Sequence, residues 1–507
     1  MRVLLVYPKY PDTFWSFKTV LKYISKKAAF PPLGLLTVAA MLPSDWEQRL
    51  VDVNVEELKD ADLAWADMVC VSGMLIQQAS AIEIIDRAKA MGKIVVGGGP
   101  LFNVRWESFS SVDHFVLNEA EVTLPLFLDD LANGRPQRVY RSDVRPDIAL
   151  TPIPAWHLIN MKHYVTMSVQ YSRGCPFNCE FCDIIIMNGR VPRMKSPTQM
   201  LAELESLRQA GWRGSVFVVD DNFIGNTKTV KLMLPELIAW QKKHHYPFHF
   251  LTEASTNLAD DEELMRLMSA ANFYKVFLGI ETPEVDSLKE CGKYQNVSRN
   301  LASSVKTIQR HGMQVMAGFI VGFDHDSEST FETQIRFIQQ VGIVTAMVGM
   351  LNAVPHTKLW ERLHSEDRLL ADSTGENTDG SLNFIPKMGK EQLISGYQYI
   401  ISQIYSTRNY YERICVFLEN YTHTARTHLT PTDIMALVKS MVRIGIFSPR
   451  NVAYWRMLIK TLLTNTRALP VVVEMMISGE HFLRVKKRIL AATNTPPLRD
   501  PETQTPA

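Results

Sequence analysis

Several features that would assign this protein to common functional classes are missing from its sequence. The 507 residues contain no run of about 18 uncharged apolar residues, so we expect no membrane-spanning helix. The apolar start, MRVLLVYPKY, is too short and too soon interrupted for a signal peptide, and we interpret it as a buried strand. Charge of neither sign dominates: 54 Lys and Arg stand against 53 Asp and Glu, giving a net charge of +1. This balance gives no electrostatic support for a nucleic-acid partner.

Cysteines are few and do not form a disulfide framework. Three of the six lie close together, at Cys175, Cys179 and Cys182, and the remaining three are scattered at Cys70, Cys291 and Cys415. A disulfide framework instead spreads paired cysteines through a small secreted domain. The pattern therefore favours a reducing cytoplasm, and we interpret the scattered cysteines as small buried apolar residues.

The length predicts roughly three domains, since single domains average about 150 residues. In residues 1–140, short apolar segments alternate with helical patterns. The segments of strand length are RVLLVYP, ADMVCVSGM, KIVVGGGP and HFVLNEAE, and the helical pattern QASAIEIIDRAKAMG ends on a glycine. Buried strands separated by helices predict a parallel, doubly wound (Rossmann-like) sheet. Ligands of such sheets bind at the carboxyl ends of the strands.

A Pro-containing linker over residues 141–165 leads into a second alternating series, over residues 166–386. Its strand-length segments are TMSVQYS, GSVFVVDD, FHFLTEAS, YKVFLGIE, QVMAGFIVGF and AMVGMLNAVP. Six β/α units are too few for the usual eight, so the sequence predicts a partial, TIM-like (β/α)6 barrel. Residues 387–490 show only helical patterns, and the polar, Pro-rich tail 491–507 is expected to be disordered. The predicted fold class is thus α/β with a helical C-terminal extension.

The cysteine cluster has the form C-x3-C-x2-C and follows the first predicted barrel strand. A structural zinc site needs four ligands, so zinc would require a distant fourth residue. Iron–sulfur clusters are also held by thiolates, usually four, and three leave one iron open for a substrate. The first βα loop lies on the active face of a barrel, which favours a catalytic cluster.

This motif, with the aromatic Phe181 just before the last cysteine, resembles the radical S-adenosylmethionine (SAM) superfamily. The resemblance implies that Cys175, Cys179 and Cys182 hold a 4Fe-4S cluster whose open iron binds SAM. It also implies reductive cleavage of SAM to a 5′-deoxyadenosyl radical, with a flavodoxin- or ferredoxin-type electron donor. The cofactor then carries the difficult chemistry, while the protein positions the reactants.

Other barrel segments resemble the cofactor contacts of that superfamily. Besides Phe181, the residues that the resemblance assigns to cofactor binding are Asp221, Glu253, Ser255 and Glu281, with Glu281 at the ribose. The backbone of GFIVGF would lie along the adenine. For each acidic residue the alternative is a carboxylate that caps a helix or lies in its first turn.

The N-terminal series resembles the cobalamin-binding domain of one branch of the superfamily. Pro31 and Pro32 precede a helix expected to begin at about Leu33. The residues implied in cobalamin binding are Pro32, Leu33, Gly34, Ser72, Met74, Gly97, Gly98 and Gly99. Three consecutive glycines would let the backbone approach a large planar ligand, although an ordinary turn also explains them.

The D-x-H-x-x-G motif that supplies a cobalt-ligating histidine in many cobalamin proteins is absent. His114 directly follows Asp113, which is the wrong spacing, and we expect it to be a structural histidine. If cobalamin binds, its lower face should therefore lack a histidine ligand.

The C-terminal segment, YWRMLIKTLLTNTRALPVVVEMMISGEHFLRVKKRIL, resembles that of hopanoid C-2 methylase-like members. One interpretation is a helical cap over the barrel mouth. The other adds a lipid-facing amphipathic surface, with Tyr454, Trp455 and a Leu stripe beside basic residues. Those basic residues are Arg456, Lys460, Arg484, Lys486, Lys487 and Arg488.

Together the resemblances imply a cobalamin-dependent radical SAM methyltransferase. One SAM would methylate cobalt, a second would be cleaved, and the methyl group would reach an unactivated carbon of an apolar, hopanoid- or isoprenoid-like lipid. Two alternatives are a cobalamin-binding radical enzyme for cyclisation or rearrangement, and a non-enzymatic metal-containing sensor or scaffold. The expected location is cytoplasmic, with contact to the inner face of the membrane as a further option.

Overall fold

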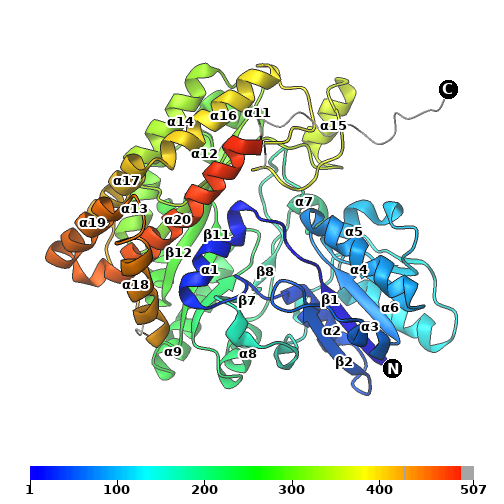
Figure 1. The fold of residues 1–507 in the computed structure, drawn as a ribbon. Coiled ribbons are helices and arrows are strands. Elements are labelled where there is room, and N and C mark those ends of the chain that lie inside the picture. Colours follow the sequence, from blue (N-terminus) through cyan, green and yellow to red (C-terminus); the bar gives the residue numbers. More distant parts are fainter. Residues whose placement is uncertain (379, 427–429, 493–507) are drawn as a thin grey trace.

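The computed structural model describes residues 1–378, 380–426 and 430–492. Two parallel six-stranded sheets, one in the N-terminal third and one in the middle of the chain, lie side by side (Figure 1). A group of C-terminal helices packs around the second sheet. The predicted disordered tail falls, from residue 493 on, outside the described residues.

The N-terminal sheet has the order β2-β1-β3-β4-β5-β6. Its strands are β1 (Arg2–Tyr7), β2 (Glu47–Asp52), β3 (Met68–Ser72), β4 (Ile94–Gly98), β5 (His114–Val116) and β6 (Val139–Tyr140). The helices around it are α2 (Leu33–Met41), α3 (Asp60–Trp65), α4 (Gln78–Ala90), α5 (Pro100–Arg105) and α6 (Ala120–Ala132). The predicted parallel, doubly wound sheet is confirmed. Strand β2 escaped prediction because its first three residues, Glu47–Arg49, are polar and reach the surface. Strand β6 also escaped prediction, because it has only two residues.

The second sheet has the order β14-β13-β12-β11-β10-β7, with all pairs parallel. Its strands are β7 (Met167–Val169), β10 (Gly214–Val218), β11 (Phe248–Ala254), β12 (Phe273–Glu281), β13 (Gln314–Val321) and β14 (Ala346–Met350). The helices between them are α7 (Ile184–Met187), α8 (Pro197–Gln209), α9 (Thr227–Lys243), α10 (Glu262–Ala270), α11 (Val285–Glu290), α12 (Tyr294–Val297), α13 (Leu301–Arg310) and α14 (Glu328–Val341). All six predicted barrel strands are present, in chain order across the sheet.

The C-terminal helices connect the barrel to the beginning of the chain. They are α15 (Lys358–Ser365), α16 (Lys390–Ile404), α17 (Thr407–Asn420), α18 (Pro431–Arg443), α19 (Asn451–Thr464) and α20 (Leu469–Ala492). Helix α20 lies beside α1 (Lys18–Ile24), so the red and dark-blue segments meet in Figure 1. Phe482 stacks on Phe14 at a centroid distance of 4.9 Å, and Glu474 pairs with Lys275 of β12. The C-terminal extension therefore fixes the N-terminal segment against the barrel.

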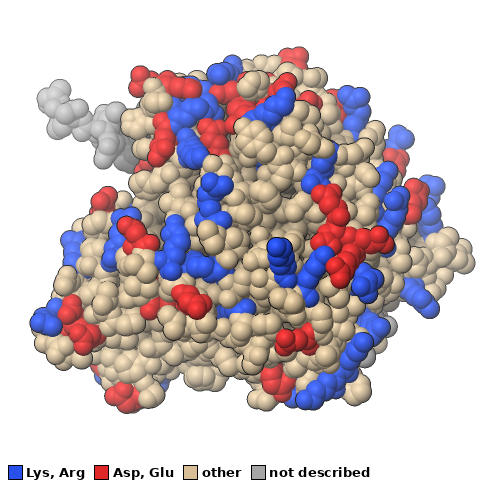
Figure 2. Space-filling view, turned by 180° about the vertical axis from the view of Figure 1, so that it is seen from behind, with Lys and Arg blue, Asp and Glu red and all other residues tan. Residues whose placement is uncertain are grey.

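Membrane-spanning helices are absent from the described part of the chain, since none of its helices is long and apolar enough. The surface seen in Figure 2 carries Lys, Arg, Asp and Glu side chains of both signs in alternation, over a largely uncharged background. That face shows no broad field of one sign, in agreement with the net charge of +1.

Candidate active site

The three clustered cysteines lie in a loop that follows β7, as the sequence predicts. A short antiparallel ribbon of β8 (Ser172–Arg173) and β9 (Arg193–Met194) closes this loop at its base. Cys179 is buried, and Cys175 and Cys182 are half-buried. Burial raises the pKa of all three thiols, because a thiolate is poorly solvated there. A positively charged group beside them favours the thiolate forms.

Two carboxylates at the end of the neighbouring strand β10 fix the backbone of this cluster loop. Asp221 accepts hydrogen bonds from the Gly174 N–H at 2.7 Å and from Asn188 Nδ2 at 2.9 Å. Asp220 accepts from the Tyr171 N–H at 2.7 Å and from Ser172 Oγ at 2.6 Å. The structure thus gives Asp221, which the resemblance assigns to cofactor binding, a direct role in shaping the loop.

Amide and ammonium groups surround the cysteine sulfurs from the barrel side. Asn222 Nδ2 lies 4.0 Å from Cys175 Sγ, and Gln295 Nε2 lies 4.0 Å from Cys179 Sγ. Lys293 Nζ is 2.6 Å from Glu281 Oε1, and its charge also favours the thiolate forms. Sequence reasoning missed Lys293 and Gln295. The only available signal was their place in the connection between the fourth and fifth barrel strands, beyond α11.

The predicted acidic contacts gather at the carboxyl ends of β11 and β12. Burial, and then the neighbouring carboxylates of Asp221 and Asp220, raise the pKa of Glu253 to about 7. Ser255 is buried and lies 3.1 Å from Asn222 Nδ2. Glu281 has a left-handed backbone, with φ of 65°, which is unusual for a residue with a Cβ. Strand-end strain of this kind is typical of a ligand site.

These side chains fit an iron–sulfur cluster better than a single metal ion. Among the residues that the structure describes, no three His, Cys, Asp or Glu side chains converge to hold one ion. A cluster needs thiolates placed around it, with N–H donors near the sulfurs. The three cysteines would supply the former, and Asn222 and Gln295 would supply the latter.

A cavity of about 130 Å³ adjoins the cluster loop. Its lining includes Phe181 of that loop, Ile320 of β13, Met350 of β14 and Asn352 just beyond. The Oδ1 atom of Asn352 is buried there without a protein partner, so a ligand donor could satisfy it. The segment 373–377 covers the cavity and reaches the N-terminal domain, where Arg105 Nη2 donates to the Ser373 carbonyl at 2.7 Å.

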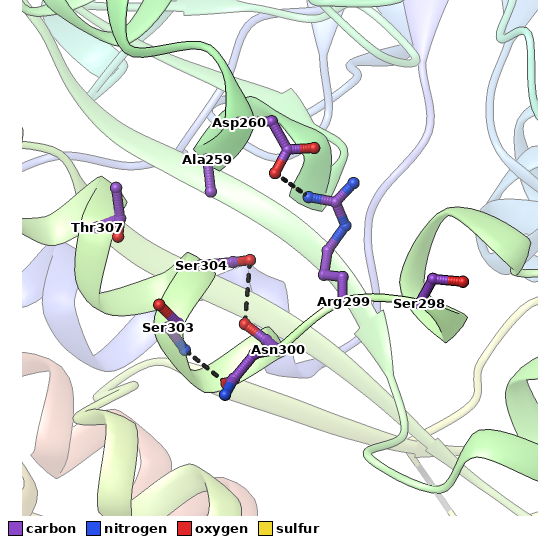
Figure 3. A pocket seen from close by; sticks show the side chains of 8 residues that line it. All are labelled: Ala259, Asp260, Ser298, Arg299, Asn300, Ser303, Ser304 and Thr307. Carbon is purple, nitrogen blue, oxygen red and sulfur yellow. Dashed lines mark hydrogen bonds and ion pairs between the residues drawn. The ribbon is translucent and has the colours of Figure 1, made fainter.

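A larger hollow, of about 310 Å³, lies at the start of α13 and is shown in Figure 3. Its wall is polar: Arg299 pairs with Asp260 at 2.5 Å, and the Ser303 N–H donates to Asn300 Oδ1. None of the predicted site residues lines it. We therefore assign the site to the smaller cavity beside the cysteines.

The residues predicted to bind cobalamin lie at the carboxyl edge of the N-terminal sheet. Ser72 ends β3, Gly97 and Gly98 end β4, and α2 begins at Leu33 behind Pro32. Met74 is 47% exposed, and a side chain on Gly34 would meet open space. Met74 and Gly34 therefore leave space beside them at this edge.

The three glycines have a more local explanation than ligand approach. A Cβ on Gly97 would lie 3.0 Å from the Phe102 ring, and one on Gly98 would lie 3.0 Å from the Val116 carbonyl. Gly99 has φ of 84°, and its Cβ would lie 2.4 Å from Ser72 Oγ. Packing within the domain thus already requires glycine here. His114 Nδ1 lies 2.6 Å from the Gln137 carbonyl, as expected of a structural histidine.

Comparison with known protein families agrees with this layout. Residues 24–128 match the B12 binding domain, residues 169–338 match the radical SAM superfamily, and residues 357–495 match a domain of unknown function, DUF4070. The fold, the cysteine loop and the family matches together identify this chain as a radical SAM enzyme with a cobalamin-binding domain. Its cofactors are a 4Fe-4S cluster, SAM and cobalamin.

Relatives that match along most of the chain identify the branch. The chain is 42% identical to "Uncharacterized methyltransferase sll1242" of Synechocystis sp. over 494 residues, covering 96% of this chain and 92% of that protein. It is 35% identical to the hopanoid C-2 methylase of Rhodopseudomonas palustris over 458 residues, covering 89% and 85%. The chain therefore belongs to the family of cobalamin-dependent radical SAM methyltransferases that includes these two proteins.

Solved structures share the fold at low sequence identity. The cobalamin-dependent SAM radical enzyme OxsB, with aqua-cobalamin and SAM bound, superimposes with a TM-score of 0.63 at 14% identity. That match covers 97% of this chain and 80% of OxsB. The radical SAM methyltransferase TsrM of Kitasatospora setae gives a TM-score of 0.57 at 13% identity, over 72% of this chain and 75% of that one.

Proposed function

We propose that this methyltransferase acts on an unactivated carbon of an apolar, hopanoid- or isoprenoid-like lipid. The observation that carries the proposal is the relationship, at 35% identity over most of the chain, to a protein named hopanoid C-2 methylase. The apolar side chains in the wall of the cavity beside the cluster loop, among them Ile320, Leu351 and Val354, also favour an apolar group near the cluster.

The residue roles that we propose follow the geometry of the site. Cys175, Cys179 and Cys182 hold the cluster, while Phe181, Glu253, Ser255 and Glu281 contact SAM. Asp221 acts through the loop that it holds. Pro32, Leu33, Gly34, Ser72, Met74 and Gly97–Gly99 face cobalamin at the sheet edge. The cluster and SAM supply a carbon-centred radical, and cobalamin supplies the methyl group, while the protein orients them and excludes water.

We also propose the domain limits given above: a cobalamin-binding domain over 1–140, a linker over 141–165, a barrel over 166–386 and a helical domain over 387–490. The reductive cleavage of SAM consumes one electron, for which we propose a flavodoxin- or ferredoxin-type donor. All six cysteines are free, which supports a reducing, cytoplasmic location.

Labelled SAM separates this function from the alternatives. Anaerobically purified enzyme with cluster and cobalamin is incubated with methyl-labelled SAM, a reductant and a lipid extract from a strain that lacks the gene. We expect the label in an apolar product and one 5′-deoxyadenosine per methylation. Formation of 5′-deoxyadenosine with an unlabelled, rearranged product would contradict methyl transfer to this substrate class.

Peripheral contact with a membrane is the second part of the proposal, and its basis is an exposed apolar surface on α18 and α19. We name it the α18–α19 surface. It consists of Ile434, Met435, Val438 and Val442 on α18, Ile446 and Phe447 in the turn, and Val452, Trp455, Ile459, Leu462 and Leu463 on α19. Phe447 is 78% exposed and Leu463 is 81% exposed. Exposed apolar patches of this extent favour a contact with another apolar surface.

The surface predicted from sequence needs one correction. Tyr454 is fully buried and Leu458 is 2% exposed, so neither can face a lipid. For Tyr454 the reason is its contact with α18: Tyr454 OH bonds to Ser440 Oγ at 2.7 Å, and the neighbouring Trp455 Nε1 donates to the Gly445 carbonyl at 2.9 Å. The lipid-facing stripe is therefore extended by α18 and the turn.

The charges around the α18–α19 surface favour an anionic bilayer over a second copy of the chain. Residues 431–469 contain one acidic residue, Asp433. The basic residues of the same segment are Lys439, Arg443, Arg450, Arg456, Lys460 and Arg467, of which Arg450 is buried. In a two-fold symmetric dimer these cations would face their own copies, whereas anionic lipid headgroups would neutralise them.

Vesicle sedimentation tests the membrane contact. We expect the protein to sediment with phosphatidylglycerol-containing vesicles, more weakly with neutral ones, and less at high salt because charges are screened. The double variant Phe447→Ser, Leu463→Ser should lose most of this binding. Leu232→Ser is the matched control, because Leu232 is 71% exposed on α9. Equal binding of the double variant, or a concentration-dependent dimer that it abolishes, would contradict the membrane contact.

A further inference from the structure

A buried ion network joins the cluster loop to the cobalamin-binding domain. Arg173 lies two residues before Cys175 in the ribbon strand β8. Its Nη1 atom is 2.8 Å from Glu119 Oε2, and its Nη2 atom is 2.7 Å from Glu121 Oε1. Glu119 is the N-cap residue of α6 and Glu121 lies in its first turn. One guanidinium thus bridges two carboxylates of the other domain.

A second arginine completes the network from the opposite ribbon strand. Arg193 pairs with Arg173 in the β8–β9 register and contacts both oxygens of Glu119, at 2.8 and 2.7 Å. It also donates to the Pro146 carbonyl at 2.7 Å and to the Asn188 carbonyl at 3.1 Å. The interdomain linker, the end of the cluster loop and α6 therefore meet at one guanidinium.

The network is enclosed and its charges balance. The side-chain exposures are 14% for Arg173, 15% for Arg193, 8% for Glu119 and 3% for Glu121. Two cations face two carboxylates, and Thr151 Oγ1 donates to Glu121 Oε1 at 2.7 Å. Removing one member leaves a buried charge without its partner, which is far more disruptive than losing a surface pair. The relative position of the two domains at this point is thus tightly determined.

The position of the network connects it with the reaction. Glu119 follows β5, so it lies at the carboxyl edge of the sheet that also carries Ser72 and Gly97. On the other side, the Gly174 N–H, next to Arg173, is held by Asp221. Methyl transfer requires the cluster loop of the barrel and the cobalamin edge of the N-terminal sheet to face the same substrate carbon. Misplacement of the reacting groups by about 1 Å can cost about a hundredfold in rate.

We infer that Arg173 is a positioning residue that couples SAM cleavage to methyl transfer, by holding the cluster loop against Glu119 and Glu121 of the cobalamin-binding domain. It touches neither the substrate nor the reacting atoms. The inference rests on the methyl transfer and on the cofactor edges proposed above. Without this bridge, SAM should still be cleaved to the radical, but fewer of the radicals formed should lead to methyl transfer from cobalamin.

The ratio of 5′-deoxyadenosine to methylated product, measured on the anaerobically purified holoenzyme with both cofactors, tests this coupling of the two steps. With the lipid extract as substrate, Arg173→Met should raise the 5′-deoxyadenosine formed per methylated product by at least about fivefold. Its iron content and rate of SAM cleavage should stay within about twofold of wild type. Glu119→Gln, which changes the other domain, should do the same. Arg173→Lys should lie in between, because an ammonium cannot bridge two carboxylates as a planar guanidinium does.

A spectroscopic measurement gives a readout that needs no substrate. Pulsed electron paramagnetic resonance measures the magnetic coupling between cob(II)alamin and the reduced cluster. The distribution of this coupling should broaden in Arg173→Met and Glu119→Gln, because the two cofactors are no longer held at one distance. Arg190→Met is the matched control, since Arg190 lies in the same loop and donates to the Pro176 carbonyl within it. That variant should keep both the wild-type coupling and the wild-type product ratio.

Distinct outcomes separate this inference from the function on which it rests. An unchanged product ratio and unchanged coupling in both variants would overturn the positioning role. Loss of iron from Arg173→Met, with normal coupling in Glu119→Gln, would also overturn it, because Arg173 would then serve only its own loop. If the wild-type enzyme forms no methylated lipid, the proposed substrate fails, while the magnetic coupling still decides the role of Arg173.

Discussion

The carboxylate of Asp221 and the backbone N–H of Gly174 are joined by a hydrogen bond of 2.7 Å, although 47 residues separate them. Gly174 has φ of 100°, and a Cβ there would lie 3.0 Å from the carbonyls of Gly189 and Val191. Asp221, just after the second barrel strand, thus binds the backbone of Gly174, whose left-handed conformation begins the cluster loop. The ligand loop is shaped by a neighbour in space and not by its own sequence alone.

The contribution of Asp221 can be tested by replacing it with Ala or Asn. Asp221→Ala leaves the Gly174 N–H and the Asn188 amide without their acceptor, so we expect a loss of about 1–3 kcal/mol in stability. Asp221→Asn keeps one side-chain oxygen and should lose less. Urea denaturation and iron content after anaerobic reconstitution are the measurements, with iron expected to fall in the order wild type, Asn, Ala. Full iron occupancy in the Ala variant would contradict the loop-shaping role.

The cysteine assignment predicts an all-or-none effect on the cluster. Cys179→Ala removes one of three thiolates, and we expect loss of the broad iron–sulfur absorbance and of SAM cleavage. Cys415→Ala changes a cysteine outside the cluster loop and should leave both unchanged. Normal SAM cleavage by the Cys179→Ala protein would defeat the assignment.

The Glu281–Lys293 pair predicts an effect on SAM binding. Their contact of 2.6 Å places a carboxylate and an ammonium beside the cluster loop, where the Glu281 carboxylate can accept hydrogen bonds from the ribose hydroxyls of SAM and Lys293 holds that carboxylate in place. We expect Glu281→Gln and Lys293→Met each to weaken SAM binding by about tenfold, which corresponds to the loss of one charge-assisted hydrogen bond. Isothermal titration of the cluster-loaded protein measures this, and Lys289→Met, an exposed lysine on α11, is the control. Wild-type affinity in both variants would remove the pair from the SAM site.

The half-buried His249 predicts a specific acid sensitivity. Desolvation in the protein, and then the positive charge of Lys275, lower its pKa from 6.5 to about 4. The unfolded chain therefore binds more protons than the folded one between these values, so stability present above pH 6.5 is lost as pH falls toward 4. The loss amounts to about 1–3 kcal/mol.

The comparison of wild type with His249→Gln isolates this effect from the carboxylates that titrate in the same range. The stability difference between the two proteins, measured by urea denaturation at several pH values, should shrink as pH falls from 6.5 to 4. The Tyr274 ring, whose centroid lies 4.7 Å from that of His249, gives a fluorescence signal for the transition. A difference that is constant with pH would show that His249 is not buried in its neutral form.

Much of the fold could be predicted because its strands are apolar runs. All six barrel strands and four strands of the N-terminal sheet carry such runs. Strand β2 was missed because its buried residues, Leu50–Asp52, follow three polar ones. Local motifs sufficed to propose the cysteines and the carboxylates at the ends of β10, β11 and β12 as site residues. Lys293 was missed because no short motif marks a lysine whose partner, Glu281, lies on the preceding strand.

By itself, the sequence determined most of the strands, because these depend on periodicity, and its C-x3-C-x2-C motif pointed to the superfamily and to three cysteines as proposed cluster ligands. The tertiary structure alone decided what each charged group does. It turned Asp221 toward the Gly174 backbone, buried Tyr454 against α18 and joined Arg173 to Glu119. The reason is physical: the energy of a charge or a polar group depends on its partners and its burial, which are set by segments distant in the chain.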